Sequence, residues 1–376
     1  MSGGGRVGTG VSTEHPSLVP TTAPAEPGTA GPLRLRLHEP GELVAAVPHL
    51  LGFRPAESLV LLAVHGDGQR RRLGVVARTD LPPPDGVTAV VSACAQRLLP
   101  SGPDEVTVLV VAAAGPDGRV GEVPPRPDVA DAVRDAFGAR GVTVRTRLWV
   151  PRIGTGVTWR CYPPCDCRGA VAATDDSPFA AATAWLGHVT YASRDELEAS
   201  LAAGAPDPRL RALIDAERRA AVLDRELGGP AAARRDHAAL LAARREVAAG
   251  RALGDAELAR LAVALGDPMV RDTVLGWSVD DDETVASSAE QLWALLVRAL
   301  PAPEVAEPGV LLACGLLAHG GSALVGVALE RARRADPAHR LTGLVTALLA
   351  AGAGPGTVRD VVRDAAAESA ARLGVG

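Results

Sequence analysis

Residues 105–150 decide the fold class of this chain. They include EVTVLVVAAAG at 105–115, DVADAVRDAFGARG at 128–141 and VTVRTRLWV at 142–150. The first and third stretches are apolar and rich in β-branched residues, as strands are, whereas the second repeats its apolar residues with a helical period. A strand, a helix of this length and another strand predict a right-handed crossover between two parallel strands.

The residues before this segment extend the same pattern. PGELVAAVPHLLG at 40–52 predicts a short helix that ends at a glycine, and ESLVLLAVHGDGQRRRLGVVARTDL at 57–81 predicts two strands joined by a turn at 66–68. A further helix is expected over 87–99. We therefore predict an α/β domain over residues 32–175, with a largely parallel sheet that is covered on both faces.

The pattern changes to helices alone in the second half of the chain. Ser193 and Glu196 have the spacing of a capping box, and helical periods then follow one another to the C-terminus. GVLLACGLLAHGGSALVGVALERARRADP at 309–337 has the small-residue spacing of a tetratricopeptide-like helical hairpin. Residues 176–376 are thus predicted to form an all-α domain with hairpins of this kind.

The composition excludes several chemistries. The chain has no lysine, so all 39 of its basic residues are arginine, which a GC-rich genome would explain. Without lysine there is no Schiff-base enzyme, no phosphate-binding Walker loop and no kinase strand lysine. The net charge of −5 gives no bulk attraction to nucleic acid or to an anionic membrane, so neither is an expected partner.

The sequence also predicts a cytoplasmic location. Residues 1–31 lack an apolar segment of signal-peptide length and are rich in Gly, Pro, Ser and Thr, so they are expected to form a disordered tail. Five cysteines, an odd number, do not suggest a secreted disulfide framework. Residues 309–329 carry no Arg, Asp or Glu and are long enough to span a bilayer, but the glycines at 320 and 321 favour two short packed helices.

Three cysteines lie within seven residues of TWRCYPPCDCRGAV, at 158–171. Cys161 and Cys165 have the spacing of one zinc knuckle, Cys167 would be a third ligand, and His188 is the nearest fourth. No second cysteine pair follows, so the incomplete ligand set favours plain reduced cysteines over a zinc site. A redox pair is less favoured still, because one residue rather than two separates Cys165 from Cys167.

Several stretches together resemble a known family. ELVAAVPHLLGFRPAESLVLLAV, then VVARTDLP, a stretch with Trp and Cys, and GGSALVGVALERARRADPAHRLTGLV are similar to an uncharacterised actinobacterial family classed as a domain of unknown function. The most specific part is the signature LLGF-P--SLV at 50–60. The resemblance implies a two-part architecture and no reaction. Family members often carry an adjacent cysteine pair, which is split here by Asp166, and this departure weakens any shared metal site.

The signature has two interpretations. Gly52 can take the left-handed conformation that ends a helix and Pro55 prevents the helix from resuming, which together make a joint between helix and strand. Alternatively, Arg54, Glu57 and Ser58 contact a ligand at the mouth of the sheet.

Two functions therefore remain open. The favoured one is a non-catalytic binding or scaffold protein whose helical domain meets a protein partner. The alternative is an enzyme whose site lies at the carboxyl ends of the parallel strands near Arg78 and Asp80, supported by a metal at the cysteines.

Overall fold

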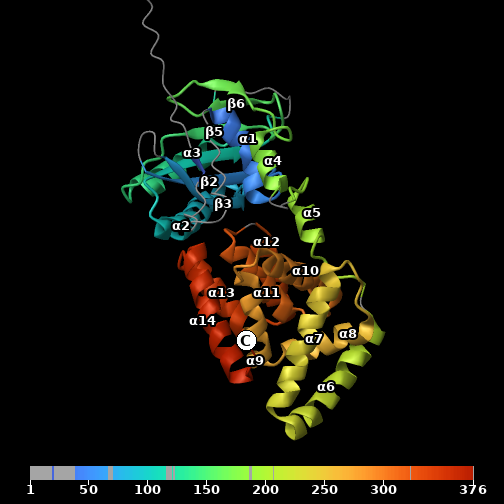
Figure 1. Ribbon diagram of the computed structural model, residues 1–376. Helices are drawn as coiled ribbons and strands as arrows, with labels where there is room; N and C mark the ends of the chain where they lie inside the picture. The colour runs from blue at the N-terminus through green and yellow to red at the C-terminus, as the bar shows by residue number, and fades with distance from the viewer. Residues whose placement is uncertain are drawn as a thin grey trace, which may run out of the picture. The chain divides into compact units, whose positions relative to one another are not determined.

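The computed structural model describes residues 19–20, 39–66, 71–115, 121, 123–185, 189–205, 207–321 and 323–375. The chain divides into two units. In Figure 1 the colour runs along the chain from blue through green and yellow to red. The first unit comprises residues 1–47 and 55–188, and the second comprises 48–54 and 189–376. The predicted disordered tail falls on residues that, apart from 19–20, lie outside the described ones.

The first unit contains the sheet. Its strands are β1 (Val19–Pro20), β2 (Ser58–His65), β3 (Arg72–Asp80), β4 (Glu105–Val111), β5 (Arg147–Val150), β6 (Thr158–Cys161) and β7 (Arg168–Ala170). Its helices are α2 (Val87–Leu98), α3 (Pro127–Gly138) and α4 (Pro178–Trp185). Helix α1 (Pro40–Leu51) begins in this unit and ends in the second.

The strand order is β1-β3-β2-β4-β5-β6-β7. Strands β4 and β5 are parallel, which confirms the parallel pairing predicted for residues 105–150. The prediction of a largely parallel sheet was wrong, because β2 is antiparallel to β3 and β4, and β6 is antiparallel to β5 and β7. The reason is that α2 carries the chain over the β2–β3 hairpin and returns it as β4 on the free edge of β2.

Helices α2 and α3 pack against one face of the sheet. Alternate residues of β2 and β4 pack with the apolar faces of α2 and α3 in one hydrophobic core. This is the arrangement expected when side chains alternate along a strand and repeat every 3.6 residues along a helix. The side chains of β2 are buried from Ser58 to Val64, so this central strand is covered on both faces. The largest fully buried side chains of this core are Trp149, Phe137, Leu59, Leu61 and Leu98.

Within the described residues, the second unit is helical and has no strand. Its helices are α5 (Arg194–Ala199), α6 (Pro208–Gly228), α7 (Pro230–Ala248), α8 (Asp255–Leu265), α9 (Pro268–Leu275), α10 (Glu283–Ala299), α11 (Ala306–Ala318), α12 (Ala323–Ala335), α13 (Arg340–Ala350) and α14 (Pro355–Leu373). They enclose one hydrophobic core around Trp293 and the buried helix α11. The predicted helical second half is confirmed.

Local predictions in this unit also hold. Ser193 caps α5 by accepting a hydrogen bond from the Glu196 amide at 3.1 Å, while the Glu196 carboxylate accepts from the Ala192 amide at 2.6 Å. Gly52 has φ +78°, the left-handed conformation expected after α1. Residues 309–318 and 323–329 belong to two separate helices, α11 and α12, that pack as a hairpin. None of the described helices has the length and apolar character needed to cross a membrane.

Candidate functional site

The three clustered cysteines lie on one hairpin of the first unit. Strands β6 and β7 pair antiparallel with Arg160 opposite Arg168, and residues 162–167 form the loop between them. The Cys161 amide donates to the Cys167 carbonyl at 2.8 Å, which closes the loop. The loop therefore brings Cys161, Cys165 and Cys167 together, with their three Sγ atoms within 4.8 Å of one another.

This spacing is close to that of a thiolate metal site. Zn–S bonds are about 2.3 Å long, so two sulfurs on one tetrahedral zinc lie about 3.8 Å apart. Cys161 is buried while Cys165 and Cys167 are half-buried, so the group has a protein-facing side and a solvent-facing side. All three cysteines are unpaired thiols.

The electrostatics single out Cys165. Partial burial acts to raise its pKa, but hydrogen bonds from the Cys167 thiol, the Cys167 amide and the Cys161 thiol outweigh burial and hold the pKa below its usual value. The amide nitrogen of Cys167 lies 3.4 Å from the Cys165 sulfur. Cys165 is thus the first of the three to become a thiolate, the form that binds metals.

Its two neighbours have the opposite shift. Burial, and then hydrogen bonding to Cys165, raise the pKa of the Cys161 thiol. The hydrogen bond to Cys165, and then burial, raise the pKa of Cys167. In the metal-free state the loop therefore holds one sulfur prone to ionise between two thiols that donate to it.

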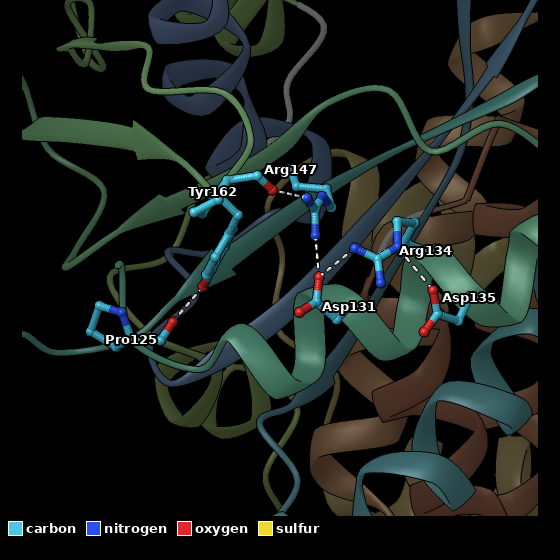
Figure 2. A network of polar contacts seen from close by, with 7 residues as sticks. Pro125, Asp131, Arg134, Asp135, Arg147 and Tyr162 are labelled. Atoms are coloured by element: carbon cyan, nitrogen blue, oxygen red, sulfur yellow. Dashed lines mark hydrogen bonds and ion pairs between the residues drawn. The ribbon is translucent and has the colours of Figure 1, made fainter. Parts of the chain in front are cut away.

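A polar network holds the loop from the side of α3, as Figure 2 shows. Arg147 begins β5, and its buried guanidinium donates to the Pro163 carbonyl and forms an ion pair with Asp131 of α3. Tyr162 donates its amide to the Arg147 carbonyl at 2.9 Å and its hydroxyl to the Pro125 carbonyl. The loop is thus anchored on both sides of the peptide between residues 162 and 163.

The fourth predicted ligand is not placed. His188 lies outside the described residues. Among the residues that the structure describes, no further His, Cys, Asp or Glu joins the three cysteines as a ligand group. Cys94 on α2 and the buried Cys314 on α11 are separate from the loop.

The second predicted cluster lies at a different edge of the sheet. Ser58 pairs with Asp80 of β3 and with Val111 of β4, so it sits where β3 and β4 have their carboxyl ends. The structure brings Ser58, Arg78 and Asp80 together: the Arg78 guanidinium donates to Ser58 Oγ at 2.8 Å and contacts Asp80 at 2.6 Å. Ser58 Oγ in turn donates to the Ala56 carbonyl at 2.6 Å.

Glu57 lies beside Ser58 and links strands β2 and β4 at this end of the sheet. It has φ +41°, and its carboxylate accepts the Ala113 amide at 2.8 Å, which links the start of β2 to the end of β4. Arg54 lies in the second unit, where its amide donates to the Tyr191 carbonyl at 3.0 Å. These contacts of Glu57 and Ser58 tie together the ends of β2, β3 and β4.

Both clusters fall within one family match. A model described as a domain of unknown function, DUF4192, matches residues 40–356. The chain belongs to the DUF4192 family. The predicted membership of a family of unknown function is therefore confirmed, and the matched range includes the cysteine loop and the signature. No curated protein and no solved structure matches the chain.

Proposed function

We propose that this DUF4192 chain is a non-catalytic binding protein whose first unit holds a zinc ion at Cys161, Cys165 and Cys167. The observation that carries the proposal is the convergence of three free Sγ atoms within 4.8 Å on a loop closed by backbone hydrogen bonds. Thiolates are soft ligands that select zinc and other thiophilic metals over magnesium or calcium.

The anchoring of the loop supports a metal site over plain loop cysteines. Contacts of Arg147 and Tyr162 hold the peptide between Cys161 and Cys165 in the absence of metal. A pre-positioned ligand set loses less conformational entropy on binding than a mobile one.

Zinc bound there would fix the β6–β7 hairpin, and either His188 or water would supply the fourth ligand. The proposal keeps the cytoplasm as the compartment, since thiols stay reduced there. The enzyme alternative has less support, because Glu57, Ser58 and Arg78 are engaged in contacts that close the sheet edge.

The test is the zinc content of the full-length chain purified under reducing conditions without chelator. We expect about one zinc per chain by plasma mass spectrometry, and a large loss of zinc in Cys165→Ser. Cys94→Ser is the matched control, because Cys94 lies on α2 outside the loop, and it should keep its zinc. Wild-type protein that stays metal-free after incubation with excess zinc and reductant would refute the proposal.

A further inference from the structure

Helix α6 carries an apolar stripe that no part of the described chain covers. The stripe consists of Leu213, Ala216, Ala220, Leu223 and Leu227, and all five residues are exposed. Leu213 is 39%, Leu223 60% and Leu227 89% exposed. The helix already buries a different face, with Leu210 and Ile214 in the core and α8 as its main neighbour. The stripe is therefore separate from the face of α6 that packs into the hydrophobic core of the second unit.

The spacing of the stripe is that of a coiled coil. Its residues follow one another at intervals of three, four, three and four, which places Leu213, Ala220 and Leu227 at a positions and Ala216 and Leu223 at d positions. Two helices pair along such a stripe by packing each a or d side chain between residues of the partner. The alanines in the two central layers allow the backbones to approach closely.

The charges that flank the stripe favour a second copy of α6 as its binding partner. Arg219 and Glu226 occupy g positions, and Glu217 and Asp224 occupy e positions. In a parallel pair of α6 helices, each g residue faces the e residue five places further along the other chain. Arg219 then faces Asp224 of a second copy, and the two-fold symmetry repeats this attraction.

The antiparallel arrangement is disfavoured by the same charges. In the antiparallel register that pairs leucine with leucine, Leu213 packs against Leu223 of the other copy. Arg219 then lies opposite Arg219 and Glu217 opposite Glu217, so like charges meet on both flanks. Asp224 already forms an ion pair with Arg235 of α7 through one carboxylate oxygen, which leaves its other oxygen for the second copy. We infer that α6 is a self-association surface on which two copies of this chain pair in parallel.

The first test is the oligomeric state of the full-length chain by sedimentation velocity over a range of micromolar concentrations. We expect a concentration-dependent dimer that Leu223→Glu combined with Leu227→Glu abolishes. Val222→Glu is the matched control, because Val222 is exposed on the same helix but lies off the stripe. A wild-type chain that stays monomeric, or equal loss of dimer in the control, would overturn the inference.

The second test uses charge exchange. Arg219→Glu alone and Asp224→Arg alone each place like charges opposite one another in a parallel pair, and each should weaken the dimer about tenfold. A mixture of the two variants should restore dimers, because both flanking pairs are then attractive. Absence of restored dimers in the mixture would contradict the proposed pairing.

The third test fixes the direction. Leu223→Cys should form an intermolecular disulfide with itself under mild oxidation, beyond what the native cysteines give in the wild type. In the leucine-aligned antiparallel pair, residue 223 lies near residue 213 of the other copy. Crosslinking that occurs only between Leu223→Cys and Leu213→Cys would therefore overturn the parallel arrangement.

Discussion

Cys165 carries the clearest residue-level signature of the proposed site. Hydrogen bonds from both neighbouring cysteines overcome the effect of its burial and lower its pKa, whereas the pKa values of Cys161 and Cys167 are raised. At neutral pH the metal-free protein thus has more thiolate at Cys165 than at either neighbour.

Alkylation rates test this order. In reduced, metal-free protein treated with limiting iodoacetamide near neutral pH, we expect Cys165 to be modified first, as followed by peptide mass spectrometry. Cys314 is the internal control for an inert thiol, because burial raises its pKa to about 12. Modification of Cys161 ahead of Cys165 would show that the hydrogen bonds do not act as described.

Glu57 offers a separate test of the joint at the signature. Its carboxylate accepts the Ala113 amide at 2.8 Å, and its φ of +41° is unfavourable for any residue except glycine. Glu57→Ala loses the hydrogen bond and keeps the strain, so it should lower the free energy of unfolding by about 1 kcal/mol. Glu57→Gly loses the same bond but relieves the strain.

The comparison between these two variants in urea denaturation isolates the backbone effect. The glycine variant should be more stable than the alanine variant by up to about 1 kcal/mol. An alanine variant as stable as the wild type would mean that Glu57 does not hold the joint.

At the scale of elements, the contact between α1 and β7 is a second testable joint. A Cβ on Gly41 would overlap the carbonyl oxygen of Ala170, which is backbone and cannot rotate away. Gly41→Ala should therefore destabilise the protein by roughly 1–3 kcal/mol, because helix and strand must separate.

Gly138 is the matched control for this substitution. It is the last residue of α3, and a Cβ there meets nothing within 4 Å. Gly138→Ala should raise stability by about 0.5 kcal/mol through helix propensity. Denaturation midpoints that fall equally in both variants would remove the close α1–β7 contact as the cause.

The elements themselves were predictable where the relevant signals are local. The strand, helix and strand of residues 105–150 follow from periodicity, and the capping box at Ser193 follows from residue type. The strand order did not follow, because nothing local says that β4 pairs with β2 rather than with β3. That choice depends on how α2 crosses the hairpin, which the apolar pattern leaves open.

The candidate metal site was predictable in the same partial way. The density of cysteines identified Cys161, Cys165 and Cys167, but the lack of a second knuckle favoured an ordinary loop. The anchoring roles of Arg147 and Tyr162 are not predictable from the sequence, since a charged residue at the start of a strand is a common surface feature. Only the fold brings Arg147 to the Pro163 carbonyl.

At the scale of the whole molecule, the buried cysteine thiols and the buried tyrosine hydroxyl predict a loss of stability at alkaline pH. Burial is the largest cause of the raised pKa values of Cys94, Cys161, Tyr162 and Cys314. In the unfolded chain these groups ionise near pH 8.5–10, so above that range the unfolded state holds fewer protons than the folded one. Their contribution to stability is complete below about pH 8.5 and is lost as pH rises.

The lack of lysine makes this test unusually clean, because no lysine titrates in the same window. In reductant and chelator, the urea midpoint measured by circular dichroism should be flat from about pH 7 to 8 and fall between about pH 9 and 10.5. Cys165 has a lowered pKa and acts in the opposite direction, but it is one group against several. A midpoint that rises over this range would contradict the account.

The central claim is that three thiolates of one loop bind a single metal ion. The most direct measurement is a titration of the reduced, metal-free chain with Co²⁺, followed through the thiolate-to-cobalt charge-transfer absorption in the near ultraviolet. We expect saturation at one Co²⁺ per chain and displacement by Zn²⁺. The intensity should fall clearly in each of Cys161→Ser, Cys165→Ser and Cys167→Ser, but not in Cys94→Ser. Titration without a charge-transfer band, or a band that survives all three loop substitutions, would contradict it.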